Sequence, residues 1–169
     1  MIETDFSIRT FRGGYDNNFS YLISCMQTGM QFLVDAAISI EKIKPYINKQ
    51  LGALLITHSH GDHTAHLDEI LTEYPNAKYI GYKDLIHKNK KFKFYPVNDN
   101  DRIILGKINM DIMHTPGHFP DSICYKMENI IFTGDTLFVG RTGRTISPNA
   151  STKDLYHSVY DKILSLHGN

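Results

Sequence analysis

The sequence has few cysteines, no net charge and no long apolar run. Each of these absences excludes a class of protein or of binding partner. Its 169 residues include two cysteines, Cys25 and Cys124, which are too few for a disulfide framework or a thiolate zinc site and are typical of a reducing cytosol. The 18 basic and 18 acidic residues balance, so no field of one sign favours nucleic acid or acidic lipid. No segment approaches the roughly 20 apolar residues of a membrane helix.

The organisation of the chain is also simple. The first ten residues, "MIETDFSIRT", lack the continuous apolar core of a signal peptide. No repeat, low-complexity tract or linker marks a domain boundary. We therefore expect a cytoplasmic protein with a single domain over residues 1–169 and a small-molecule partner, with neither nucleic acid nor a membrane as partner. The oligomeric state is left open.

Hydrophobic patterns predict a sheet covered by helices. Strands are expected at residues 19–26, 31–37, 53–57 and 77–82, and hairpins at 102–113 and 122–134. Helices are expected at residues 40–51, 65–74 and 151–166, the last with Ser151 as its N-cap.

The nine histidines are the compositional anomaly, and three of them lie in "THSHGDH", residues 57–63. Protonated imidazoles so close together would repel one another, and neutral buried ones would each need a partner. A divalent metal resolves both problems because it binds neutral imidazole. Gly61 is expected to turn the backbone sharply and to return Asp62 and His63 toward the same cavity. This cluster predicts a metal site.

Further ligands are expected where other apolar strands end. His114 follows the strand at 108–113 and precedes a Thr-Pro-Gly turn, and Asp135 follows the strand at 130–134. Either residue alone fits a loop cap equally well, but both share the position of the histidine cluster, just past an apolar strand. His118 is expected to hydrogen-bond within its loop and not to bind metal.

The segments "THSHGDH", "HTPGH" and "FTGDTLFVGRTGRT" resemble the metallo-β-lactamase-fold hydrolases, particularly the branch of hydroxyacylglutathione hydrolases (glyoxalase II) and persulfide dioxygenases. The resemblance runs from about Asn18 to the end of the sequence. It implies an α/β (α+β) fold, a four-layer αββα sandwich with metals in a groove at one edge of its sheets. It also implies one more ligand histidine after a strand beyond the last helix, so the sequence is expected to be short of the last C-terminal strand.

The resemblance implies which residues bind metal. The first site would comprise His58, His60 and His114, and the second Asp62 and His63, with Asp135 bridging the two. Such ligands suit one or two zinc ions, and iron or manganese is possible. The function implied is a metal-dependent hydrolase with a metal-bound hydroxide, acting on a small thioester such as a hydroxyacylglutathione. Asp62 and Asp135 are the expected catalytic carboxylates.

Substrate contacts follow from the same resemblance, and two other functions stay open. Arg144 occupies the position of a basic residue that binds a glutathione carboxylate in the family, and Arg141 lies near it. The first alternative is a persulfide dioxygenase-like oxidoreductase with one iron held by His58, His114 and Asp135. The second is a metal-binding relic without activity.

Overall fold

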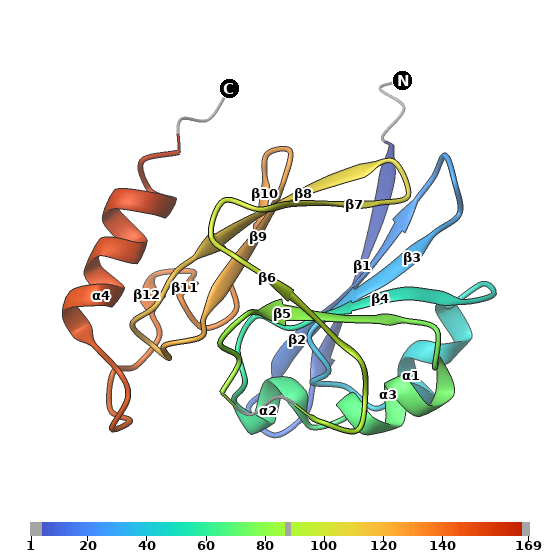
Figure 1. The fold of residues 1–169 in the computed structure, drawn as a ribbon, viewed down its shortest axis with the longest axis horizontal. Helices are drawn as coiled ribbons and strands as arrows, with labels where there is room; N and C mark the ends of the chain where they lie inside the picture. Colours follow the sequence, from blue (N-terminus) through green and yellow to red (C-terminus); the bar gives the residue numbers. More distant parts are fainter. Residues whose placement is uncertain (1–4, 87–88, 167–169) are drawn as a thin grey trace.

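The computed structural model describes residues 5–86 and 89–166, and its framework is formed by two β-sheets (Figure 1). The larger sheet has six strands in the order β1 to β6, in which β1–β3 are antiparallel and β3–β6 parallel. Its strands are β1 (Phe6–Gly13), β2 (Asn18–Cys25), β3 (Gln31–Val34), β4 (Leu51–Leu55), β5 (Lys78–Tyr82) and β6 (Phe94–Val97).

The smaller sheet is antiparallel and has the order β10-β9-β8-β7. Both predicted hairpins are confirmed, because β7 pairs with β8 and β9 pairs with β10. A separate two-stranded ribbon, which the sequence did not predict, follows. The strands are β7 (Arg102–Leu105), β8 (Ile108–His114), β9 (Ile123–Met127), β10 (Ile130–Phe132), β11 (Leu137–Phe138) and β12 (Arg141–Thr142).

The helices are short, and one is much shorter than predicted. They are α1 (Ile40–Ile43), the 3-10 turn η1 (Lys44–Tyr46), α2 (Gly61–Thr64), α3 (Leu67–Glu73), α4 (Thr152–His157) and the π-helical η2 (Ser158–Ile163). The helix expected at 40–51 ends as an α-helix at Ile43 because Pro45 has no N–H for the next helical bond. The N-cap prediction is confirmed, since the Ser151 hydroxyl accepts a hydrogen bond from the Asp154 amide.

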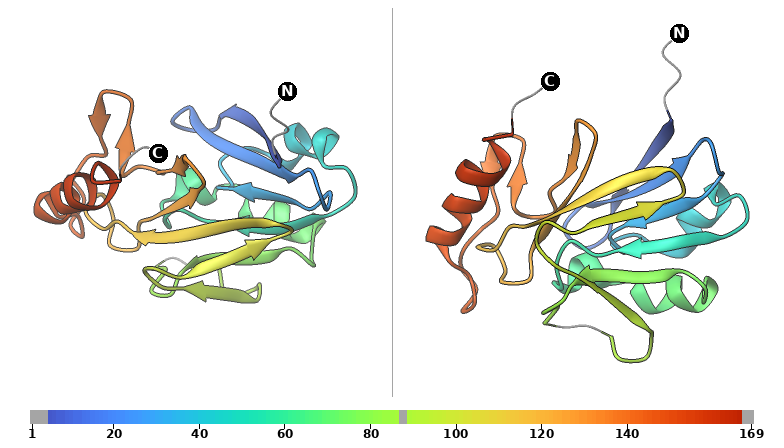
Figure 2. Two further views of the ribbon diagram at one scale, coloured as in Figure 1. Left: turned by 90° about the horizontal axis from the view of Figure 1, so that it is seen from above. Right: turned by 45° about the horizontal axis from the view of Figure 1, so that its top comes forward.

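Two apolar cores hold these layers together, which confirms the predicted α/β class. One fills the space between the two sheets and includes Phe32, Leu55, Met110 and Tyr125. The other lies between the larger sheet and helices α1 and α3. Helix α4 lies at the end of the molecule opposite α1 (Figures 1 and 2). Within residues 5–86 and 89–166, no helix has the length and apolar character to span a membrane.

The sheet topology places several loops at one edge. Strands β3 and β4 are parallel, so the segments that follow them, from Asp35 and from Ile56, leave the same edge of the sheet. The smaller sheet is tied to this edge by the Ile123 amide, which donates to the Thr57 carbonyl over 2.8 Å. Loops that follow β8 and β10 therefore meet the loop that follows β4.

Candidate metal centre

The loop after β4 delivers three histidines to one place. His58 and His60 are two residues apart in extended chain, and the helical turn α2 then begins at Gly61. The expected turn at Gly61 is present, but Gly61 does not have a positive φ, so the turn does not depend on the conformational freedom of glycine. The helical turn itself returns His63 to the cluster, where its ring centroid lies 4.2 Å from that of His58.

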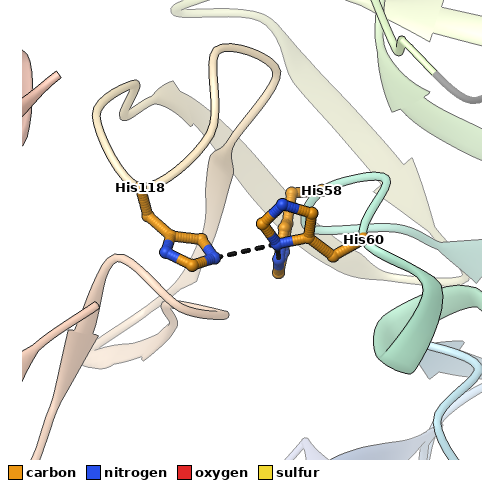
Figure 3. Close-up of side chains that lie close together, drawn as sticks. All are labelled: His58, His60 and His118. Atoms are coloured by element: carbon orange, nitrogen blue, oxygen red, sulfur yellow. Dashed lines mark hydrogen bonds between the residues drawn. The ribbon is translucent and has the colours of Figure 1, made fainter. Parts of the chain in front are cut away.

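A fourth histidine comes from the loop between β8 and β9. Figure 3 shows the ring of His118 pointing at His60, with His118 Nε2 2.9 Å from His60 Nδ1. The same His60 nitrogen lies 3.1 Å from His58 Nε2. His58, His60 and His118 therefore form a group whose nitrogens could hold a metal ion.

Two rings of this group, those of His118 and His58, already donate their protons to acceptors outside the group. His118 Nδ1 lies 2.8 Å from the Arg144 carbonyl, which only accepts, so this nitrogen carries the proton and Nε2 has a free lone pair. The Thr57 hydroxyl donates to Asp35, so His58 Nδ1 donates to Thr57 and its Nε2 also has a lone pair. Two lone pairs thus face His60 Nδ1, whose single proton cannot fully satisfy both. A cation at this point would satisfy all three nitrogens, so the donor set fits a metal ion.

The electrostatics of the group agree with this reading. Burial, followed by the neighbouring His63, His60 and His118, lowers the pKa of His58 well below its usual value. Burial and His118 also lower the pKa of His60. Both imidazoles are therefore neutral at physiological pH, which is the form that binds metal.

A second group shares His58 and adds His63 and Asp135. His63 Nε2 lies 3.0 Å from Asp135 Oδ1, and His63 Nδ1 lies 2.8 Å from Asp35 Oδ2. Burial alone would lower the pKa of His63, but Asp35 and Asp135 raise it to about 10. Burial would raise the pKa of Asp135, but the hydrogen bond from His63 lowers it. Without metal, His63 is thus an imidazolium between two carboxylates.

Asp62 stands at the margin of this second group. Its Oδ2 accepts a 2.6 Å hydrogen bond from the Asn18 amide and lies 3.9 Å from His63 Nε2. The position of Asp135 depends on Gly134, which has a φ of +49°. Gly134 also passes so close to Thr57 that a Cβ at this position would lie 2.5 Å from the Thr57 hydroxyl oxygen.

The structure does not bring His114 to the site, so this predicted ligand is wrong and its place is taken by His118. His114 is the last residue of β8 and lies on the same face of that strand as the buried residues Met110 and Ile112. Its ring stacks on Tyr82 with centroids 4.0 Å apart, and its Nε2 donates to the Pro120 carbonyl over 2.8 Å. Within the described ranges, neither metal-binding group includes it.

One sequence signal argued against His114, and the structure adds the reason why His118 takes its place. Strand alternation places His114 on the same face as Ile112, toward the space between the sheets. The turn then places His118 past Gly117, whose φ of +137° and close approach to the Leu155 backbone leave no room for a side chain. The ligand therefore follows the turn and does not precede it.

Two buried carboxylates that support the histidines were not predicted. Asp35, at φ +60°, accepts from the Thr57 amide, the Thr57 hydroxyl and His63. Asp121, from the loop that carries His118, accepts from the Ser59 amide at 3.2 Å and the Ser59 hydroxyl at 2.5 Å. Asp121 thus joins the His118 loop to the residue between His58 and His60.

We expect Asp121→Asn to weaken metal binding by about 10- to 100-fold, the range typical of partners that orient metal ligands. In this variant the side-chain NH2 of the asparagine would face groups that now donate to the carboxylate, namely Ser59 and the backbone amide of Ile86. Competition with a chromogenic chelator measures the affinity. The matched control is Asp111→Asn, which removes a carboxylate paired with Arg102 on an exposed strand. Equal affinities in both variants would contradict the role of Asp121.

Metal binding to the second group is expected to release about one proton, because the ion replaces the Nε2 proton of His63. His58 and His60 are already neutral, so the three-histidine group should release almost none at neutral pH. Affinity at the second group should rise about tenfold per pH unit from neutrality and level off near pH 10, the pKa of His63. Calorimetry in buffers with different ionisation enthalpies counts the protons, and binding enthalpies independent of buffer would contradict this.

Two cavities open beside Asp135. One is mainly apolar and also reaches His63 and Thr57. The other is bordered by Arg12, Arg141 and Arg144, so both arginines predicted as substrate contacts lie near the site and the sequence interpretation missed the third.

Comparison with known proteins identifies the family of this chain. The family model described as "Metallo-beta-lactamase superfamily" matches residues 13–166. A hydroxyacylglutathione hydrolase of Francisella philomiragia is 38% identical over 158 residues, which cover 91% of this chain and 57% of that protein. A probable hydroxyacylglutathione hydrolase of Schizosaccharomyces pombe is 33% identical over 152 residues, 83% of this chain and 57% of that protein. The chain thus spans little more than half the length of these relatives.

Among solved structures, ETHE1 from Myxococcus xanthus is similar with a TM-score of 0.81 and 26% identity, covering 95% of this chain and 71% of that one.

Proposed function

Because this chain belongs to the metallo-beta-lactamase superfamily, we propose that it is a metal-dependent hydrolase of small thioesters, such as a hydroxyacylglutathione. The observation that carries the proposal is the convergence of three imidazole nitrogens, because two of these rings carry their proton on the other nitrogen, where it bonds to a different acceptor. Relatives named hydroxyacylglutathione hydrolase support the choice of substrate.

Two adjoining groups would hold the metal. His58, His60 and His118 form the first, and His63 and Asp135 the second, with His58 adjoining both and Asp62 at the margin. Zinc suits these nitrogen and oxygen ligands, with iron or manganese as alternatives. When bound, such an ion lowers the pKa of water toward neutrality and polarises a carbonyl oxygen.

The roles of the protein's own residues follow from their surroundings. The lowered pKa of Asp135 keeps it ionised, so it can accept a hydrogen bond from the attacking water. Asp62, held by Asn18, supplies the second catalytic carboxylate. Arg141 and Arg144 are suited to bind the carboxylates of the thiol portion.

Two nearby residues that could act as nucleophiles are poorly suited to do so. The Ser59 hydroxyl donates to Asp121 and is buried. The Cys124 thiol is fully buried, and burial raises its pKa to about 11. Both cysteines are unpaired, which agrees with a cytoplasmic location. Water is therefore the nucleophile that this site favours.

The test is thiol release from S-lactoylglutathione by the purified protein loaded with zinc, iron or manganese. Metal-dependent release, lost on chelation and restored by metal, supports the proposal. Its absence with all three metals would refute it.

A second candidate is a mononuclear iron persulfide dioxygenase, with His118 in the position predicted for His114. It is favoured by one observation: His118 Nε2 lies 3.5 Å from Asp135 Oδ2, and its ring centroid lies 5.1 Å from that of His58. Two histidines and one carboxylate thus lie close enough to hold one iron. Oxygen uptake with glutathione persulfide, without thioester hydrolysis, would favour it. Bound metal with neither activity would indicate the remaining alternative, a metal-binding protein that has lost its catalytic activity.

A further inference from the structure

The C-terminal helix, which consists of α4 and η2, contacts the loop that carries His118 (Figure 1). In the part of the chain that the structure describes, neither metal-binding group includes a residue of this helix. The helix and its N-cap nevertheless donate hydrogen bonds to three carbonyls of the backbone that leads to His118. These bonds run from the Ser151 amide to the Gly117 carbonyl over 2.8 Å, from the Ser158 hydroxyl to the Pro116 carbonyl over 2.7 Å and from the Lys162 ammonium to the His114 carbonyl over 2.7 Å.

Two of these bonds serve carbonyls that the sheet does not reach. Strand β8 ends at His114, so its pairing with β9 gives no donor to the carbonyls of Pro116 and Gly117. A backbone carbonyl that is shielded from water needs another donor. Ser158 is only 3% exposed, so water cannot readily replace its hydroxyl. The Ser158 hydroxyl therefore fixes the loop at Pro116, two residues before His118.

Lys162 fixes the point at which the loop leaves the strand. Its ammonium also lies 2.8 Å from Asp99 Oδ2, and the other carboxylate oxygen of Asp99 accepts a hydrogen bond from the His114 amide over 2.7 Å. Lys162 and Asp99 thus bond to both backbone groups of His114 and to each other. Such charge-assisted hydrogen bonds are stronger than neutral ones. The base of the loop is therefore held by its backbone, independently of the His114 ring.

The shape of the helix suits this contact. Gly117 passes so close to it that a Cβ would lie 2.2 Å from the Leu155 amide nitrogen. From Ser158 to Ile163 the helix is π-helical, a geometry that is rare and is frequent at functional sites. Ser158 and Lys162 both belong to this segment, so the unusual part of the helix is the part whose side chains bond to the loop.

The imidazole ring of His118 is held from the same end of the chain. Its Nδ1 donates to the Arg144 carbonyl over 2.8 Å, in the segment that leads to α4. Gly143 lets this segment pass close by, since a Cβ there would lie 3.0 Å from His118 Nδ1. With the loop backbone and Nδ1 both fixed, Nε2 points at His60 Nδ1, 2.9 Å away (Figure 3).

We propose that Ser158 and Lys162 are positioning residues of the metal centre, which hold residues 114–117 so that His118 Nε2 faces the ion. The proposal rests on the metal-binding role that His118 has in the proposed function. Neither residue belongs to a metal-binding group, so each acts through His118. Its effect on metal binding therefore disappears when His118 is absent.

The first test is a double-mutant cycle on zinc affinity, measured by chelator competition. The protein carries His63→Ala, which leaves only the three-histidine group. Ser158→Ala and Lys162→Met should each weaken zinc binding by about tenfold, the lower end of the range for residues that orient ligands. With His118→Ala added, neither substitution should change the remaining affinity by more than about twofold. An equal loss with and without His118, or no loss in either protein, would overturn the proposal.

Ser165→Ala and Lys153→Met are the matched controls. The Ser165 hydroxyl donates to carbonyls of its own helix, those of Asp161 and Lys162, and Lys153 is an exposed residue of α4. Both variants should keep the affinity of the parent protein. Melting temperatures report any loss of stability. A substitution that weakened zinc binding merely by loosening the fold would do so without His118 as well.

The second test needs no metal. In the metal-free protein, long-range proton–nitrogen NMR spectra should show His118 as a single tautomer with its proton on Nδ1, as the bond to Arg144 requires. The double variant Ser158→Ala/Lys162→Met frees the loop, so it should give a mixture of both tautomers, whereas Ser165→Ala should not. A His118 spectrum that the double variant leaves unchanged would overturn the proposal.

Neither test uses turnover, so the two proposals fail separately. A protein that binds zinc but hydrolyses no thioester would refute the proposed function alone. If the wild-type protein bound no zinc, the proposed metal site would fail, and the NMR spectrum of His118 would still decide whether Ser158 and Lys162 set the position of its ring.

Discussion

Replacing His118 by alanine is expected to weaken metal binding at the group of His58, His60 and His118 by more than 100-fold, whereas replacing His114 should leave the affinity there within about threefold of wild type. The loss should exceed the roughly 10- to 100-fold cost of removing a residue that merely orients a ligand. His118 Nε2 lies within 2.9 Å of His60 Nδ1 and has a free lone pair. The ring of His114 instead stacks on Tyr82 and donates to the Pro120 carbonyl.

The two variants form a matched pair because they change the same residue type four positions apart in the chain, at the end of β8 and in the loop that follows it. Chelator competition gives the affinities, and circular dichroism shows whether each variant is folded. His114→Ala should cost about 1–3 kcal/mol of stability, since it removes a hydrogen bond and an aromatic contact. A variant without His118 that retains wild-type affinity would show that this histidine is not a ligand.

Replacing His58 by alanine is expected to remove all tightly bound metal, because His58 belongs to both metal-binding groups. His60→Ala and His63→Ala each disrupt one group, so each variant should retain metal at the other. Elemental analysis of dialysed protein gives the number of ions per chain. His58→Ala should also abolish hydrolysis, since no ion would remain to activate water.

The control for this series is His157→Ala, which removes an exposed histidine that pairs with Asp161 on the C-terminal helix. It should keep the metal content and turnover of wild type. If His58→Ala retained as much metal as this control, the shared position of His58 would be wrong. If all three ligand variants lost all metal, the two groups would be one cooperative site.

The contrast between His114 and His118 shows the limit of the sequence. Both histidines flank the same Thr-Pro-Gly turn, and spacing alone does not say which one faces the cluster. The decision comes from β8, whose alternation turns His114 toward Tyr82, and from the packing of Gly117 against Leu155. The role of Asp121 also could not be predicted from the sequence, because it depends on a contact with Ser59, which lies 62 residues earlier in the chain.

The sequence by itself determined the chemistry: neutral histidines and carboxylates crowded after an apolar strand are best accommodated by a metal ion, and the hairpins followed from local alternation of apolar residues. Only the tertiary structure decided which side chains meet, because the parallel pairing of β3 with β4 brings Asp35 beside Thr57 and the second sheet delivers His118 and Asp135. Local propensities act over a few residues, whereas a metal centre is formed by nitrogens and oxygens within a few ångströms. Their approach depends on how distant segments pack.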